Sequence, residues 1–400
     1  MILIDRMMFY SLWIFIVIMP CSNTVVLFSQ FLYKLSTWGP LAIMLMHVFS
    51  LFVRENMPNK EKVKLPLTFV LFFALFIFWL ILSYFWSIDQ DKTFHRILYY
   101  LRQNIPIVYI VIAIIKTNEH IASLMKAYVL GCFVSVAAIF YAFSFGISFG
   151  SDFSNRYAAA GFDPNDLALI LCLGIPMAWY IAVREKRKVL DLLLYIYISF
   201  CVAAIFLTGS RGAFIAALIA ISIIPMTYLK QSIWLKMLLL FIASATIYAV
   251  SILIPPVIFE RFYGISEELQ RGSLSQRFYI WKAGLQVFQE HAIFGAGAGT
   301  FYIAVSKFFG GRPPSHNAFL SVLAEEGIIG FMFFISMLVV LINNIRFLPS
   351  LQRNVWLVLM LTWTVGASSL TWDYYSQTWF LFGLAAAQIS VHDKTLENKT

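Results

Sequence analysis

The stretch PLTFVLFFALFIFWLILSYFW, residues 66–86, contains no charged side chain. It is long enough to cross a bilayer as one helix, because about 20 apolar residues span a hydrocarbon core of roughly 30 Å. Comparable runs recur along the chain of 400 residues, of which 61% are apolar and 12% are charged. A soluble core of this size requires no such runs. The sequence therefore predicts an all-α polytopic membrane protein.

Apolar segments and the charges between them define the expected organisation. The runs predict about twelve transmembrane helices, near residues 7–28, 36–53, 66–86, 97–115, 121–146, 164–183, 190–208, 212–229, 233–255, 317–345, 354–371 and 373–390. We therefore expect nine helices in residues 1–255, a long outer loop in 256–316, three helices in 317–390 and a tail in 391–400. The first helix is expected to stay uncleaved, because no small-residue cleavage site follows it.

The basic residues predict the orientation. The net charge is +9, and lysine and arginine concentrate in alternate short loops. These residues are Arg54, Lys60, Lys62, Lys64, Arg184, Lys186, Arg187, Lys188, Lys230, Lys236, Arg346, Arg353, Lys394 and Lys399. Loops rich in lysine and arginine face the cytoplasm, so both termini are expected there and residues 256–316 outside. The same distribution argues against nucleic acid as a partner. The four cysteines, in or beside apolar runs without metal-binding spacing, are expected to be core residues.

The outer segments carry mostly arginine. These residues are Arg96, Arg102, Arg156, Arg211, Arg261, Arg271, Arg277 and Arg312. A guanidinium group binds phosphate or carboxylate oxygens two at a time, which favours an anionic ligand, although each arginine could instead reach lipid headgroups. Arg211 lies in a very short turn, where Gly209 and Gly212 would let a ligand approach the backbone.

The long outer segment predicts an amphipathic helix. Leu274, Phe278, Trp281, Leu285 and Phe288 recur at spacings of three and four, and would form a stripe on the bilayer surface or over a cavity. Ser273 and Gln276 fit a capping box at its start. Arg277, one turn before Trp281, is either directed over the opening of the bundle or an ordinary polar-face residue. The following GAGAG, residues 295–299, is expected to be a flexible turn and not a dinucleotide loop, because no strand precedes it.

His316 follows two prolines and begins the helix predicted from residue 317. The positive end of a helix dipole disfavours protonation, which suits a proton acceptor. The alternative is a hydrogen-bonded interfacial histidine. Asn317 is expected to cap the helix. Topology places His316, Arg211 and Arg277 at the same outer level, where they could serve an external anion.

Four motifs resemble those of the O-antigen ligase and polymerase superfamily. They are GFDPNDLAL (161–169), TGSRGAF (208–214), SQRFYIWKAGLQVFQEHAIFGAGAGTF (275–301) and SHNAFLSVLAEEGIIG (315–330). The resemblance covers roughly residues 155–345, and it matches Arg211, Arg277 and His316 to the superfamily's functional positions. It implies a fold related to the lipid-dependent (GT-C-like) glycosyltransferases in the bacterial inner membrane.

The resemblance also implies a reaction on the periplasmic side. A polysaccharide on undecaprenyl diphosphate would pass to a hydroxyl acceptor, with lipid A-core as the acceptor in a ligase, and without cofactor or metal. Arg211 and Arg277 would stabilise the leaving diphosphate, and His316 would accept the acceptor's proton. Arg156, Trp281, Arg312 and Asn317 are further substrate-binding candidates. The first outer loop has no acidic residue, and Asp152, Asp163 and Asp166 cluster by sequence only, so we expect no metal site.

Two alternatives remain open at this stage. A polymerase of the same superfamily shares the chemistry and differs in acceptor; one dominant outer loop and a compact chain favour the ligase. A transporter or flippase of an anionic lipid-linked glycan would also use outer arginines and about twelve spans. Neither paired halves nor a mid-span acid pair is evident in the sequence, which argues against transport.

Overall fold

A computed structural model describes residues 2–26, 29–54, 65–148, 156–228, 233–263 and 276–397, and within them every regular element is helical. In chain order the helices are α1 (Ile2–Ile18), η1 (Met19–Cys21), α2 (Ser22–Val26), α3 (Gln30–Arg54), α4 (Leu67–Leu82), η2 (Ser83–Phe85), α5 (Gln90–Tyr99), the π-helix η3 (Tyr100–Asn104), α6 (Ile105–Ile114), α7 (Asn118–Ser144), α8 (Pro164–Glu185), α9 (Lys188–Leu207), α10 (Arg211–Ile221), α11 (Ile223–Tyr228), α12 (Ile233–Leu253), α13 (Pro256–Tyr263), α15 (Arg277–Glu290), α16 (Phe301–Ala304), α17 (Ser306–Phe309), α18 (Ala318–Ile345), α19 (Ser350–Ala367) and α20 (Ser376–Glu397).

Nine helical segments of the described chain are long and apolar enough to cross a membrane. They coincide with nine of the twelve predicted spans. The other three predicted spans are also helical, as α10 with α11, α19 and α20, but they are not among these candidates. The all-helical, membrane-spanning class is confirmed, and the number twelve stays a prediction. Residues 391–397, expected in a tail, extend helix α20.

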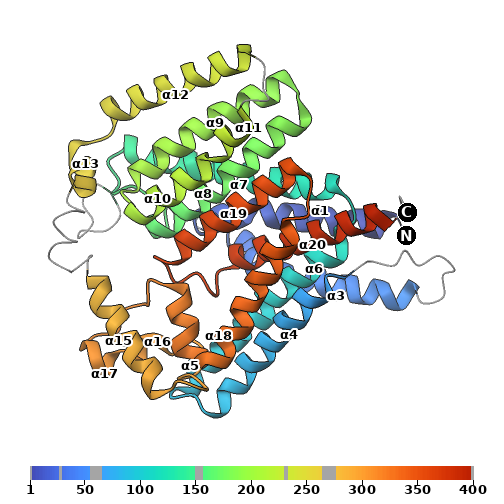
Figure 1. Ribbon diagram of the computed structural model, residues 1–400, viewed down its shortest axis with the longest axis vertical. Helices are drawn as coiled ribbons and strands as arrows, with labels where there is room; N and C mark the ends of the chain where they lie inside the picture. The colour runs from blue at the N-terminus through green and yellow to red at the C-terminus, as the bar shows by residue number, and fades with distance from the viewer. Residues whose placement is uncertain are drawn as a thin grey trace.

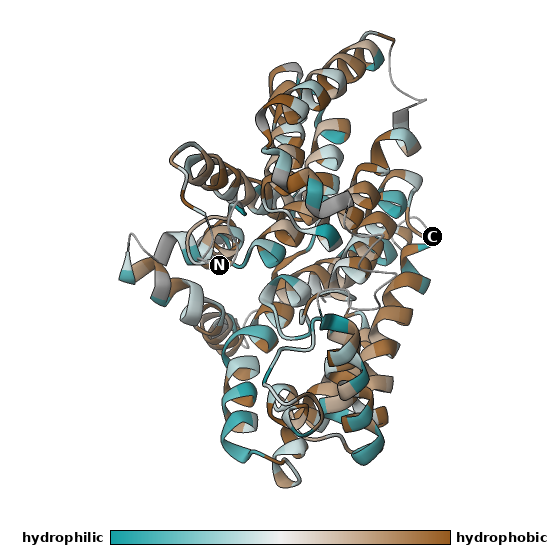
Figure 2. Cartoon of the chain, turned by 90° about the vertical axis from the view of Figure 1, so that its left-hand side faces the viewer, coloured by the Kyte–Doolittle hydropathy of each residue, from teal (hydrophilic) through white to brown (hydrophobic). Residues whose placement is uncertain are grey.

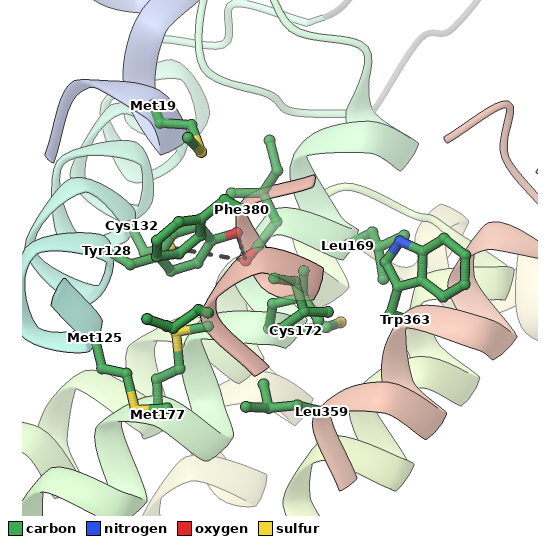
Figure 3. Packing of buried hydrophobic residues seen from close by; sticks show 14 of the residues in the cluster. Met19, Met125, Tyr128, Cys132, Leu169, Cys172, Met177, Leu359, Trp363 and Phe380 are labelled. Carbon is green, nitrogen blue, oxygen red and sulfur yellow. Dashed lines mark hydrogen bonds between the residues drawn. The ribbon is translucent and has the colours of Figure 1, made fainter. Parts of the chain in front are cut away.

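Helix α8 lies at the centre of the upper part of the bundle, packed against α7, α9, α10 and α19 (Figure 1). Its apolar window is 89% buried, whereas that of α12, at the edge of the bundle, is only 6% buried. Tyr128, Cys132 and Cys172 belong to the apolar core that surrounds α8 (Figure 3). All four cysteines are buried and free, which confirms their predicted place in the core.

The outside of the bundle is apolar. Figure 2 shows hydrophobic residues along most of the helices, and exposed side chains include Phe49 on α3, Phe78 on α4 and Phe241 on α12. Such a surface is stable against lipid and not against water. The expected basic residues Lys60, Lys62, Lys64, Lys230 and Lys399 lie outside the described residues.

Helix α15 confirms that a helix lies in the long segment before His316. The face that it buries against the protein is not the predicted apolar stripe, which was expected on the bilayer surface or over a cavity. Ile280, Ala283, Gly284 and Val287 are buried instead, while Phe278 and Leu285 are about half exposed. Small residues occupy the buried face because they allow α15 to pack closely against α18. A Cβ on Gly284 would lie only 2.9 Å from the side chain of Leu320 on α18. The exposed apolar residues are left to face lipid or a ligand.

The predicted capping box of Ser273 and Gln276 stays a prediction, because Ser273 lies outside the described residues. Gln276 directly precedes α15 with φ 66°, and its side chain makes no capping hydrogen bond to that helix. Ser273 and Leu274, like Arg271 and Asp152, lie outside the described residues.

The GAGAG turn is fixed and not flexible. Gly295, Gly297 and Gly299 all have positive φ. The backbone N–H of Gly297 donates to the Glu325 carbonyl at 2.8 Å, and the Glu325 carboxylate accepts from the N–H groups of Gly299 at 2.8 Å and Phe301 at 3.0 Å. A Cβ on Gly295 would lie 2.2 Å from the Glu325 carbonyl oxygen, so only glycine fits there. These hydrogen bonds therefore fix residues 295–301 against helix α18.

Helix α18 is kinked where this turn meets it. Gly327 has φ 65° and ψ −170° inside the helix, and the indole N–H of Trp79 donates to the freed carbonyl of Glu326 at 2.8 Å. Glu325 and Glu326 are both buried within this candidate span. The pair lies within the first third of the span and not at its middle, so it is not the mid-span acid pair that a transporter would favour. Its role is local, since the carboxylate of Glu325 accepts from the neighbouring backbone.

Candidate active site at the start of helix α18

The segment before α18 holds His316 in an uncommon backbone conformation. His316 has φ 47°, a left-handed value that costs energy for a non-glycine residue and is often associated with functional sites. Its backbone N–H donates to Thr371 Oγ1 at 3.1 Å, and Ser315 Oγ contacts the same hydroxyl at 3.0 Å. Asn317 Oδ1 accepts from the N–H of Leu320 at 3.0 Å, which confirms the predicted cap. The histidine thus lies just before the helix and not in its first turn.

Arg211 is the first residue of α10. Ser210 caps this helix by accepting from the N–H of Ala213 at 3.4 Å. Gly212 packs against the segment between α19 and α20, since a Cβ there would lie 2.5 Å from Ser369 Oγ. The expectation that Gly212 leaves room for a ligand is therefore wrong, because Ser369 fills that room. Ser369 lies two residues before Thr371, so one connecting segment contacts the starts of both α10 and α18.

Arg277 is the first residue of α15, and Trp281 fixes this helix to the segment that carries His316. The Trp281 indole N–H donates to the Ser315 carbonyl at 3.1 Å. Arg277 is partly buried, and burial followed by the positive charge of Arg211 lowers the pKa of its guanidinium. The two arginines therefore lie close enough to repel each other.

His316 lies next to this pair of cations. Burial and then the positive charge of Arg277 lower the pKa of its imidazole, to about 4, while Asp163 acts in the opposite direction. The structure therefore gathers Arg211, Arg277 and His316, which come from three separate segments of the chain. At neutral pH the imidazole is uncharged and its ring can accept a proton.

Asp163 is the site residue that the sequence did not predict. It was grouped only with other acids by sequence, but it lies where its charge acts on both Arg277 and His316. Its carboxylate also begins α8, since Oδ1 accepts from the backbone N–H of Asn165 at 2.7 Å. The aspartate before proline in GFDPND was a recognisable helix-capping signal, but its nearness to His316 arises only from tertiary packing.

Arg156 ties two of these segments together. It is buried, its Nε donates to the Thr208 carbonyl at 2.8 Å, and Nη2 donates to Asn165 Oδ1 at 2.8 Å. These contacts hold the start of α8 against the turn that carries Arg211, so they position the site. Substrate binding by Arg156 and Trp281 stays a prediction, as it does for Asn317 and for Arg312, which is exposed.

Two other outer arginines have protein partners. Arg96 pairs with Asp373 at 3.3 Å and stacks 4.0 Å from the ring of Tyr374. Arg102 lies 5.1 Å from the ring centroid of Trp38. The sequence left open whether each arginine reaches a ligand or a lipid headgroup, and the structure gives both arginines contacts within the protein. The side chain of Arg261 and all of Arg271 lie outside what the structure describes.

The geometry defines a multi-pass membrane protein with a cationic site, containing one uncharged histidine, where several helices begin. Within the described residues, no group of three or more histidine, cysteine, aspartate or glutamate side chains could hold a metal ion. Residues 196–335 match the family described as O-antigen ligase, a glycosyltransferase-like family of enzymes. This match supports the resemblance to the O-antigen ligase and polymerase superfamily that the motifs predicted, over the segment that contains Arg211, Arg277 and His316. A comparison with curated proteins found no match.

Proposed function

We propose that the protein is an O-antigen ligase, which transfers polysaccharide from undecaprenyl diphosphate to a sugar hydroxyl of lipid A-core. The observation that carries the proposal is the meeting of Arg211, Arg277 and His316 in one site, within or beside the segment that matches the family. Two adjacent cations suit a dianionic ligand, because such a ligand relieves their repulsion.

The leaving group and the proton define the roles of these residues. The acceptor oxygen attacks the anomeric carbon, the bond from that carbon to the diphosphate oxygen breaks, and the diphosphate leaves with the electron pair. Arg211 and Arg277 bind the diphosphate, where negative charge grows in the transition state. His316 takes the proton from the acceptor hydroxyl. The activated donor supplies the free energy, so the reaction needs no nucleotide. The two arginines take the charge-stabilising role that a metal ion could otherwise fill on a leaving diphosphate.

The proposal that the donor is a lipid is supported by an apolar cavity in the bundle. It has a volume of about 320 Å³ and lies between α7, α9 and α12, with Phe143, Phe200 and Ile254 in its walls. Leu207 also lines it and directly precedes the turn that ends at Arg211. A polyprenyl chain in this cavity would bring its diphosphate towards the arginines. In the proposed topology this end of the bundle faces the periplasm, both termini are cytoplasmic, and the membrane is the bacterial inner membrane.

The size of the outer segments favours a ligase over a polymerase. The segment from 256 to 316, before α18, contains α13 and α15–α17, whereas α7 and α8 are separated by a shorter stretch. A transporter is disfavoured by the match to a family of enzymes. The buried Glu325 also needs no transported ion, because two backbone N–H groups bind it.

The proposal is tested by reconstituting the purified protein with an undecaprenyl diphosphate-linked glycan and lipid A-core. Wild type should attach the glycan to lipid A-core, seen as a mobility shift on a gel. His316→Ala should remain folded and inserted but lose transfer, because it removes the base and leaves the Asn317 cap in place. Elongation of the glycan on undecaprenyl diphosphate, without attachment to lipid A-core, would instead identify a polymerase. Full activity of His316→Ala would reject the assigned base.

A further inference from the structure

A second, smaller cavity lies at the end of the bundle where α1 ends and α20 begins. Its volume is about 180 Å³. Asn23, Thr37, Gln103, Ser376 and Gln377 supply amides and hydroxyls to its walls, and aromatic side chains line it as well. No charged side chain is among the described residues that line it. This lining differs from the arginine site, which is cationic.

A π-helix forms one wall of the cavity. Residues Tyr100–Asn104 form η3 between α5 and α6, and such single π turns are rare and frequently lie at functional sites. Gln103 of this turn lines the cavity. Its Nε2 donates to the carbonyl of Ser36 at 3.2 Å, and its Oε1 accepts from Ser376 Oγ at 2.8 Å. Tyr99 OH lies 3.2 Å from the same Ser376 hydroxyl. These bonds hold the polar groups in fixed directions before any ligand arrives.

Two segments of the chain connect the lining of the cavity with the candidate active site. Phe162, which lines the cavity, precedes Asp163, whose charge acts on His316. Tyr375 also lines the cavity, and its hydroxyl donates to Asp166 at 2.6 Å. The other oxygen of Asp166 accepts from the indole of Trp372 at 2.9 Å, and Trp372 follows the Thr371 that binds the His316 backbone. A ligand in the cavity would therefore be held beside the reacting groups.

We propose that this cavity binds one neutral sugar residue of a glycan that takes part in the reaction. Fixed amides and hydroxyls complement sugar hydroxyls, and the aromatic rings of Tyr375 and Phe162 offer apolar faces for the C–H side of a pyranose. The volume is below the roughly 300–1,000 Å³ of sites for drug-sized ligands, which suits a single ring. An anionic sugar would be disfavoured, because none of the described residues that line the cavity is a cation that could replace its lost hydration.

The inference rests on the proposed function for the identity of the glycan, and kinetics decide which glycan it is. Ser22→Trp fills the cavity, and Ser350→Trp, at the exposed start of α19, is the matched control. Ser22→Trp should raise KM at least tenfold for either lipid A-core or the donor glycan, with kcat within about threefold of wild type. Ser350→Trp should change neither KM. If Ser22→Trp leaves both KM values within twofold of wild type, the cavity does not bind either glycan.

Direct binding tests the cavity without any transfer reaction. Saturation-transfer NMR on the full-length protein in detergent micelles uses methyl glucopyranoside and its uronic acid counterpart as probes. The neutral probe should give a signal several times stronger than the anionic one in wild type and in His316→Ala, and none in Ser22→Trp. Equal signals from the two probes, or no signal from the neutral one, would overturn the inference. Absence of transfer by wild type would defeat the proposed function alone, and this binding result would still decide the cavity.

Discussion

Exchanging the two site arginines for lysine separates ligand binding from simple charge. Arg211→Lys and Arg277→Lys keep the positive charge but lose the planar group that can donate two parallel hydrogen bonds to a diphosphate. A hydrogen bond to a charged group contributes about 1.5–3 kcal/mol, and 1.36 kcal/mol is tenfold in rate. Because Arg277 is partly buried next to Arg211, solvent screens its bond to the ligand only weakly. We therefore expect each lysine variant to lose on the order of 10² in kcat/KM for the donor.

The measurement is the initial rate of glycan transfer from a synthetic undecaprenyl diphosphate donor, with all variants at matched expression. Arg346→Lys is the control, because Arg346 is exposed and lies at the opposite end of α18 from His316. Its rate should change by no more than about threefold, since any cation satisfies a headgroup or solvent. Near-native rates for both Arg211→Lys and Arg277→Lys would refute the bidentate binding of diphosphate.

Three further outcomes are expected. Because the pKa of His316 is lowered to about 4, the base stays unprotonated well below neutral pH. The value of kcat/KM should therefore remain level as pH falls from 7 to about 5 and decline through about 4. An inflection near 6.5, the ordinary pKa of histidine, would contradict this environment. Transfer should survive thorough chelation, and loss that added magnesium or manganese restores would reject the metal-free mechanism. Glu325→Gln replaces one backbone-accepting oxygen by an amide NH₂, so it should cost about 2–3 kcal/mol and lower the apparent Tm in detergent by several degrees, whereas the exposed Glu290→Gln should not.

The elements were predictable where one local signal decided them. Long charge-free runs such as residues 66–86 have no stable alternative to a helix in lipid, and helix α4 occupies most of that run. The Asn317 cap was equally local, because its side chain bonds a backbone group only three residues away. No local signal decided which face of α15 is buried. Its apolar stripe and its small-residue face compete for the interior, and the shape of α18 decides between them.

The three main residues of the candidate site were predictable from the sequence, but the tertiary contacts that bring them together were not. Motif order and topology placed Arg211, Arg277 and His316 at one level, but Asp163 joins them only because the start of α8 packs beside the turn at Thr208 through Arg156. No spacing in the sequence records a contact between segments so far apart. The same applies to the bond between Glu325 and the glycine turn. That bond depends on a kink at Gly327, and helical periodicity does not reveal a kink.

The electrostatics of the free site suggest an order for the proposed reaction. Arg277 and burial make His316 a weak base before substrate binds, as its pKa of about 4 shows. A diphosphate bound by Arg211 and Arg277 would neutralise these cations, and a nearby anion favours the protonated imidazole, so the basicity of His316 would rise. The residue would then be able to deprotonate an acceptor hydroxyl mainly when a donor is present. Such coupling would reserve the base for the complex that can complete the transfer, and Arg277 would serve both the leaving group and the proton.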